Sequence, residues 1–126
     1  FLNGGAGNDT LDGGGGADTL TGGRGADKFV FDSTGDAGLG LGLRDVITDF
    51  KARDFDVIDL SPIDADTTQG GDQAFSFIGA SAFGSHAGEL RLALGILSGD
   101  VDGNGVADFE IQLTGVTVLT TSAFIL

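Results

Sequence analysis

Cysteine is absent from the 126 residues, and histidine occurs only once, at His86. A chain without thiols has no disulfide framework, no thiolate zinc site and no cysteine nucleophile. A single imidazole cannot build the paired-histidine zinc site of an H-E-x-x-H motif, so we expect no zinc in this chain. An extracellular location remains open if something other than disulfides stabilises the fold.

Positive charge and long apolar runs are also scarce. Six Lys and Arg stand against nineteen Asp and Glu, which gives a net charge of −13. Such a surface repels phosphate backbones and anionic lipids, so we expect cations as partners and no nucleic acid. No apolar run approaches the roughly 18 residues that span a bilayer, so we expect no membrane insertion.

Glycine and aspartate dominate what is present. Ten of the 24 glycines lie within the first 25 residues, and 17 of the 19 acidic residues are Asp. Glycine loses more conformational entropy on folding than any other residue, so this segment should not fold without an added ligand. The chain as a whole is 40% hydrophobic and contains ten Phe, which is enough for a core in the second half.

An internal repeat of nine residues explains the glycines. Residues 4–12, 13–21 and 22–30 each fit G-G-x-G-x-D-x-U-x, where U is a large apolar residue. The glycines allow positive φ and let several carbonyls converge, while the sixth-position Asp adds a carboxylate and the last three residues predict a short strand. Calcium accepts such mixed oxygen ligands, so the repeat predicts several calcium ions. Residues 1–3 fit the end of an earlier copy, so we expect the array to begin upstream in a longer protein.

The nonapeptide resembles the calcium-binding repeat of RTX (hemolysin-type) proteins, and this resemblance implies a parallel β-roll. In that family successive turns alternate between two sides, so residues 4–9 would share an ion with residues 22–27. The implied metal ligands are the turn residues of the three copies: Gly4, Gly5, Ala6, Gly7, Asp9, Gly13, Gly14, Gly15, Gly16, Asp18, Gly22, Gly23, Arg24, Gly25 and Asp27.

Asp36 and Asp45 continue the nine-residue period after the glycines end. We expect them to be ligands that complete the sites opened by residues 13–18 and 22–27, respectively. The alternative is that both are solvated loop acids. Asp54 also falls in phase, but it lies in a turn between two strands, and we interpret its position as coincidence.

The second half has the pattern of an all-β structure. Alternating and β-branched residues predict strands at 46–50, 57–60, 74–78, 89–97 and 109–113, and residues 61–64 predict a helical turn. We expect an antiparallel sheet or sandwich, residues 46–126, that caps the β-roll of residues 1–45 within one continuous domain.

Five blocks of this half, residues 44–50, 57–61, 71–79, 87–91 and 99–109, resemble the C-terminal domain of serralysin-type secreted metalloproteases. The resemblance implies a non-catalytic module, an upstream catalytic domain and extracellular secretion. It also implies an uncleaved signal for the type I (ABC transporter) machinery at residues 124–126. Members of that family tend to carry an acidic residue just before the terminal tripeptide, whereas Ser122 and Ala123 stand there in this chain.

Two other functions are weighed against the protease module. The chain is alternatively the RTX module of a secreted carbohydrate-active enzyme, such as an alginate-modifying one, in which it aids polymer binding. An autonomous hydrolase is disfavoured because no G-x-S-x-G elbow is present and Ser85 is merely adjacent to His86, which we expect in a surface loop. The open first turn also makes end-to-end association of rolls an expected possibility.

Residues 100–108 have partial EF-hand spacing. Asp100, Asp102, Asn104 and Asp108 take positions 1, 3, 5 and 9, but Ile111 stands where the bidentate Glu belongs. A glycine-rich hairpin turn and a weak cation site both remain open for this segment.

Overall fold

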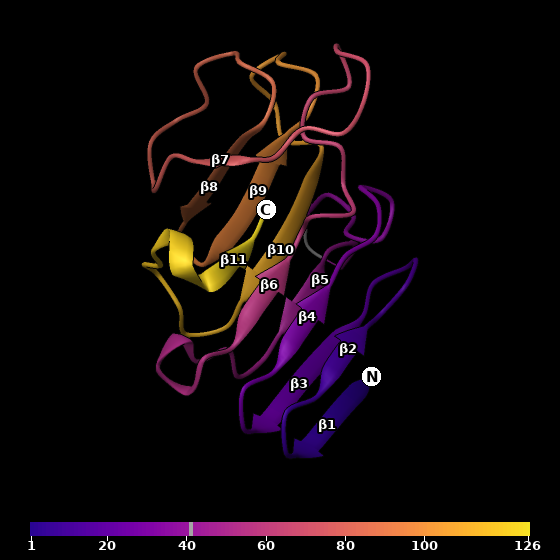
Figure 1. Cartoon of the computed structure of the whole chain (residues 1–126), viewed down its shortest axis with the longest axis vertical. Coiled ribbons are helices and arrows are strands. Elements are labelled where there is room, and N and C mark those ends of the chain that lie inside the picture. Colours follow the sequence, from indigo (N-terminus) through magenta and orange to yellow (C-terminus); the bar gives the residue numbers. More distant parts are fainter. Residues whose placement is uncertain (41) are drawn as a thin grey trace.

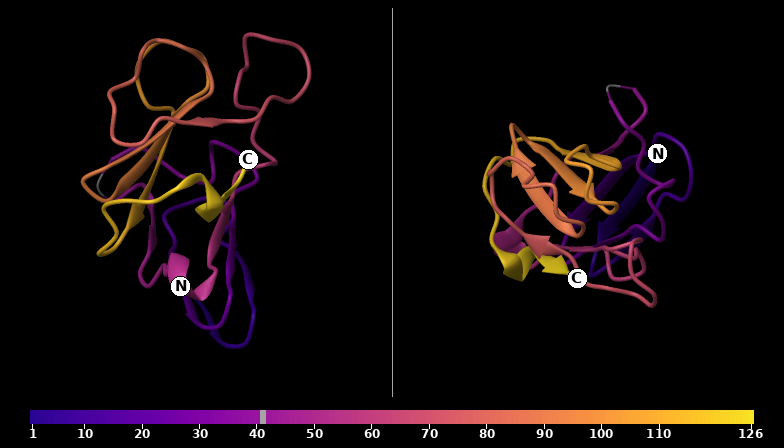
Figure 2. Two further views of the ribbon diagram at one scale, coloured as in Figure 1. Left: turned by 60° about the vertical axis from the view of Figure 1, so that its left-hand side comes forward. Right: turned by 90° about the horizontal axis from the view of Figure 1, so that it is seen from above.

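The computed structural model describes residues 1–40 and 42–126, and its strands form two facing sheets (Figures 1 and 2). The larger sheet has the order β1 (Leu2–Ala6), β3 (Thr19–Arg24), β5 (Asp45–Ile47), β10 (Phe109–Leu113), β9 (Ile96–Asp100), β8 (Glu89–Ala93) and β7 (Ser76–Phe77). The smaller sheet has the order β11 (Phe124–Ile125), β6 (Val57–Asp59), β4 (Lys28–Val30) and β2 (Thr10–Asp12). Two 3-10 turns, Ala52–Asp54 and Thr121–Ala123, complete the elements. None of the helical elements in these ranges is long and apolar enough to cross a membrane.

The three nonapeptides form the parallel β-roll that the sequence predicts. β1 pairs with β3 so that Leu2 lies beside Leu20, and β2 pairs with β4 so that Leu11 lies beside Phe29. Each of these partners is 18 residues away, two repeats along the chain. Leu20 and Phe29 are fully buried because every apolar position of the repeat points between the two sheets. The fold class is therefore all-β, with a β-roll at the amino-terminal end (Figure 1).

The cap continues both sheets of the roll. β5 pairs in parallel with β3 on one side and with β10 on the other, while β6 pairs in parallel with β4 and with β11. The predicted antiparallel part consists of β8, β9 and β10. Residue 45, the expected boundary, thus lies inside a sheet that runs through the roll and the cap without interruption.

Two expectations for the second half are wrong in detail. Residues 89–97 form a hairpin and not one strand, because Leu94 and Gly95 both have positive φ (54° and 76°) and reverse the chain. Residues 61–64 form a turn and no helix, since the Ser61 hydroxyl donates to Asp59 Oδ1 (2.6 Å) instead of capping a helical turn. The predicted strand at 109–113 is confirmed residue for residue.

Phenylalanine supplies the core of the cap. Phe75 packs edge-on against Phe109 with ring centroids 5.7 Å apart, and Phe77 packs against Phe124 at 4.9 Å. The roll connects to this core through Phe29, whose ring lies 6.1 Å from Phe50. Aromatic pairs of this kind add to the stabilisation that comes from burial itself.

The stacked apolar positions of the roll lead to a first prediction. Leu20→Ala should lower the free energy of unfolding by about 2–5 kcal/mol, because Leu20 is fully buried between neighbouring strands and its loss leaves a cavity. Urea denaturation with saturating calcium measures this. Val118→Ala is the control, since Val118 is 81% exposed and should change stability by less than about 0.5 kcal/mol. Equal losses for the two variants would contradict the assigned core.

Candidate metal centre

The glycines of each turn have two separate structural roles. Those at the second and fourth repeat positions adopt positive φ, for example 94° at Gly5 and 115° at Gly7. The first glycine does not, but a Cβ at Gly4 would lie 2.7 Å from Asp9 Oδ2, and one at Gly13 would lie 2.9 Å from Asp18 Oδ2. The repeat therefore needs glycine twice for backbone conformation and once to leave room for its own carboxylate.

The sixth-position aspartates form a ladder between stacked turns. The backbone N–H of Asp9 donates to Asp27 Oδ1 (2.9 Å), and that of Asp27 donates to Asp56 Oδ1 (3.0 Å). On the other side of the roll, the N–H of Asp18 donates to Asp45 Oδ1 (2.8 Å). The first of these contacts joins the two turns that the RTX resemblance pairs.

The second oxygen of three of these carboxylates lacks a partner. Oδ2 of Asp9, Asp27 and Asp45 is buried and has no hydrogen bond to any residue that the structure describes. Asp27 is only 1% exposed and Asp45 is fully buried. A buried carboxylate oxygen without a donor costs free energy unless a cation satisfies it. Calcium binds oxygen ligands of this kind, so the residues present fit the ion that the repeat implies.

Asp45 does not lie where the nine-residue period places it. The sequence pairs it with residues 22–27, whereas the structure puts it beside Asp18. Residues 31–44 lengthen this turn, so Leu20 lies beside Ile47, 27 residues on, instead of a residue 18 positions away. Period counting fails because it assumes turns of constant length.

Asp36 is held within its own loop. Its Oδ2 accepts the backbone N–H groups of Asp32 and Ser33, and its Oδ1 accepts the Ser33 hydroxyl. The stacked contact expected for it with residues 13–18 is made by Asp45. Its charge nevertheless lies close enough to Asp45 to raise the pKa of that carboxyl, so Asp36 adds to the negative potential of the site. The degenerate turn at 40–45 includes residue 41, which lies outside the described residues.

Asp49 and Asp56 also belong to the ladder, and the sequence analysis missed both. Asp49 accepts the N–H groups of Gly22 and Gly23, each at 2.9 Å, and Asp56 accepts those of Asp27 and Lys51. Asp54 lies outside the ladder in the 3-10 turn, with Oδ2 3.9 Å from Lys51 Nζ, as its interpretation as coincidence implies. Three repeats would place the stacked partner of Asp27 at Asp54, 27 residues along the chain. The observed partner, Asp56, lies 29 residues along, because this turn contains two extra residues.

Burial and neighbouring carboxylates raise the pKa values of Asp45 and Asp56 in the ladder. Burial is the main cause that raises the pKa of Asp45 from 3.8 to about 6, and the charges of Asp18 and Asp36 raise it further against the hydrogen bond from Asp18. Burial, with repulsion from Asp27 and Asp49, also raises the pKa of Asp56. Without a cation, both groups therefore hold a proton more tightly than an exposed Asp does.

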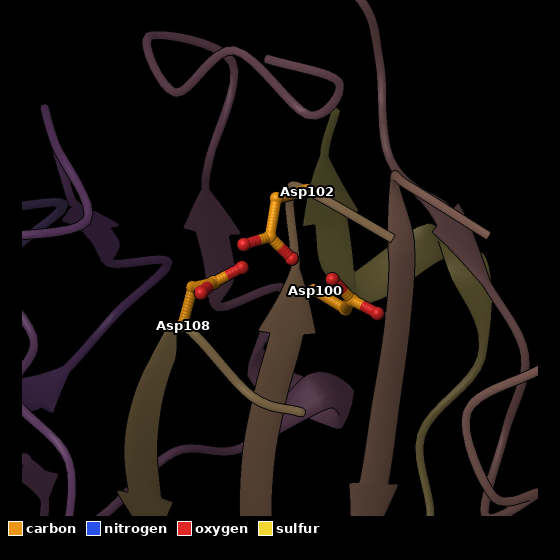
Figure 3. Close-up of side chains that lie close together, drawn as sticks. All are labelled: Asp100, Asp102 and Asp108. Carbon is orange, nitrogen blue, oxygen red and sulfur yellow. The ribbon is translucent and has the colours of Figure 1, made fainter. Parts of the chain in front are cut away.

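The loop of residues 100–108 joins antiparallel β9 and β10, as the hairpin interpretation predicts. Ligand oxygens of Asp100, Asp102 and Asp108 lie within 4.8 Å of one another, and Figure 3 shows the last two turned toward each other. Both Asp100 oxygens accept N–H groups, from Gly103 (2.7 Å) and Gly105 (2.8 Å). The buried carboxylate thus has donors from its own loop, unlike Asp45.

His86 lies at the surface, as expected. Its side chain is 80% exposed, and Nδ1 lies 3.3 Å from Glu89 Oε1 at the start of β8. An exposed loop histidine paired with a glutamate does not form the oriented nucleophile–base arrangement of a hydrolase.

Comparison with known proteins agrees with the class that this geometry defines, a parallel β-roll with oxygen-rich turns. Residues 1–29 match the model of the RTX calcium-binding nonapeptide repeat in four copies. This part of the chain is therefore an RTX calcium-binding repeat. No curated protein matches the sequence.

Among solved structures, the chain is similar to the solution structure of the AlgE6R3 subunit from the Azotobacter vinelandii mannuronan C5-epimerase. The two are 30% identical with a TM-score of 0.61. The match covers 98% of this chain and 66% of that structure, so it includes the cap as well as the roll.

The space around the first-position glycine leads to a second prediction. Gly13→Ala should raise the calcium concentration needed for folding about tenfold, because its Cβ displaces the Asp18 carboxylate without requiring a change of φ. Gly15→Ala is the matched control in the same turn, since its Cβ meets no atom within 4 Å and its φ is not positive. Calcium titrations followed by circular dichroism measure both, and an equal requirement for the two variants would contradict the assigned role of Gly13.

The raised pKa of Asp45 leads to a third prediction. Because the folded, metal-free state holds this proton more tightly than the unfolded chain, its stability should fall as the pH rises from about 4 through 6. Metal-free protein should therefore retain more β structure, measured by circular dichroism, at pH 5 than at pH 7.5, and the gain in β signal on adding calcium should be larger at pH 7.5.

Asp45→Asn tests the assignment to this carboxyl. The amide keeps an acceptor for the Asp18 N–H but carries no charge, so it should weaken the pH dependence of the metal-free protein and reduce the stabilisation by calcium. A variant with the pH profile of the original protein would show that other groups are responsible.

Proposed function

We propose that this chain is a calcium-binding module without catalytic activity whose amino-terminal roll folds when calcium binds. The observation that carries the proposal is the set of buried, unpartnered Oδ2 atoms of Asp9, Asp27 and Asp45. Each of these buried carboxylate oxygens is unfavourable in the folded chain unless a divalent cation neutralises it. Binding energy at such a site becomes folding energy, because the unfolded chain has no preformed site.

The ladder supports at least two ions. One would lie between the turns of residues 4–9 and 22–27, where Asp9 contacts Asp27, and another between residues 13–18 and Asp45. Backbone carbonyls of the glycine-rich turns would complete the shells, and Asp36, Asp49 and Asp56 would add negative charge around them. The ligand set consists of oxygens, which suits calcium and does not suit zinc, a metal that prefers imidazole and thiolate ligands.

Calcium-dependent folding fits a protein that is exported unfolded. RTX repeat proteins are typically secreted, and the free calcium concentration is low inside cells and near millimolar outside them. In the folded chain the terminal apolar residues are paired and partly buried, since Phe124 and Ile125 form β11 beside β6 and Phe124 is 8% exposed. If residues 124–126 act as a type I export signal, the ABC transporter would read them before this pairing forms. Folding outside would then oppose return.

The module would belong to a larger secreted enzyme whose catalytic domain lies upstream. The match over 98% of the chain to a subunit of a mannuronan C5-epimerase supports the carbohydrate-active alternative. The serralysin-like interpretation rests on the sequence blocks of the second half. An H-E-x-x-H motif in the preceding segment would identify the protease class. Calorimetric binding of a uronate polymer that requires calcium would favour the carbohydrate class, because a net charge of −13 opposes unaided binding of a polyanion.

Calcium-linked folding gives the fourth prediction. The chain should show a largely disordered circular dichroism spectrum in chelator and a β spectrum after calcium is added. Asp18→Ala and Asp27→Ala should each raise the calcium midpoint, since each removes a carboxylate from the ladder. His86→Ala is the control and should leave the midpoint unchanged, because this side chain is exposed and distant from the ladder in sequence. A full β spectrum in chelator at neutral pH would overturn the proposal.

A further inference from the structure

An ion pair connects residues 31–44, the insertion after the third repeat, to the cap. Arg44 Nη1 lies 3.1 Å from Glu110 Oε2, and the side chains are only 15% and 22% exposed. The other carboxylate oxygen, Glu110 Oε1, accepts the backbone N–H of Gly40 (2.8 Å). Partly buried charges are screened less by salt than surface pairs, so this contact is a stronger constraint than an ordinary surface ion pair.

The contact holds the chain on both sides of the turn that leads to Asp45. Arg44 immediately precedes Asp45, and its own N–H donates to the Gly40 carbonyl (3.2 Å), which closes the turn. Glu110 immediately precedes Ile111, the residue paired with Asp45 between β10 and β5. A single side chain of the cap therefore contacts both ends of the turn, and it lies next to the residue that pairs with Asp45.

The cap also faces the second repeat from this side. A hollow of about 400 Å³ is lined by Gly16 and Ala17 of the second turn, by the insertion and by Asp108 of the cap. The Asp9–Asp27 pair differs, because it lies beside β2 and β4 of the other sheet, where its contact with the cap is the hydrogen bond from Asp27 to Asp56. The two candidate calcium sites thus depend on different contacts with the cap.

We infer that Glu110 is a positioning residue for the calcium site at Asp18 and Asp45, so that its contacts with Gly40 and Arg44 raise the affinity of that site and leave the site at Asp9 and Asp27 unaffected. The inference rests on the proposed calcium function. Its physical basis is that the unpartnered Asp45 Oδ2 binds an ion well only while the backbone that carries it is held in place. A residue that orients a ligand without touching the metal commonly changes affinity by about ten- to a hundredfold.

The cap supplies a matched control in Glu89. Like Glu110, it pairs with one basic side chain, His86 (3.3 Å), and accepts one backbone N–H from a loop, that of Gly84 (2.6 Å). It lies on β8, in the same sheet, but its contacts hold the loop of residues 84–86, which carries none of the candidate ligands. Loss of this pair tests the effect of removing a similar contact from the cap alone.

The fifth prediction concerns calcium release from the folded, calcium-loaded chain of 126 residues. Mixing with an excess of fluorescent chelator should resolve release from the two sites, which Asp45→Asn and Asp9→Asn assign by removing one phase each. Glu110→Gln keeps an acceptor for Gly40 but loses the charge, and it should accelerate only the phase that Asp45→Asn removes, by about tenfold. Arg44→Gln should do the same, and Glu89→Gln should alter neither phase.

The outcomes separate this inference from the function on which it rests. Release at the original rates in both Glu110→Gln and Arg44→Gln would overturn the positioning role. Equal acceleration of both phases would also overturn it, because that result indicates general destabilisation. If Asp45→Asn removes no phase, the calcium site at Asp18 and Asp45 is itself wrong, and the failure lies with the proposed function.

Discussion

Buried aspartate oxygens that lack a donor are the constraint on which the amino-terminal half depends. Asp27 and Asp45 each use Oδ1 to accept the backbone N–H of a stacked turn, and Asp9 donates its own N–H to Asp27. In all three aspartates Oδ2 is buried and unpaired. Glycine at the first repeat position follows from this arrangement, because a larger residue would occupy the space of the carboxylate. The unusual composition and the need for a cation thus have the same structural origin. A segment with so little apolar surface needs that cation to offset its loss of entropy.

The sequence was informative where the repeat is regular and misleading where it is not. The stacking of Leu2 on Leu20 and of Leu11 on Phe29 agrees with the alternating turns that the RTX resemblance implies, and so does the pairing of Asp9 with Asp27. The pairing of Asp18 with Asp45 and that of Asp27 with Asp56 could not be predicted in this way, because the segments between them are longer than the repeat requires. A better signal was present in the sequence. Except for Asp49, each ladder aspartate stands two residues before a buried apolar residue, as Asp45 does before Ile47 and Asp56 before Ile58. Strand register preserves that local relation, whereas insertions change the number of residues between turns.

The architecture of the cap depended on contacts that local patterns do not encode. The parallel pairing of β5 with β10 joins Asp45 to Ile111, and nothing in the alternation of either strand predicts a partner 66 residues away. The hairpin at residues 94–95 was missed because apolar residues continue through it, including Leu94, which is 95% exposed. Strand existence could be predicted for most of the half. Strand order could not, because many pairings bury the same residues equally well.

The shared sheets bear on how metal binding and core formation cooperate. A solenoid turn is stable only when a neighbour covers its edges, and here the roll supplies β3 and β4 as the neighbours of β5 and β6. If calcium is absent and the roll is unfolded, the cap exposes unpaired edges on both sheets, including the edge beside Asp45. The Phe75–Phe109 and Phe77–Phe124 pairs lie farther along and need no metal themselves, but they are joined to strands that lose partners. Calcium bound near the amino-terminal end would therefore stabilise the hydrophobic half through strand pairing, and the whole chain, rather than the glycine-rich segment alone, would respond to the ion.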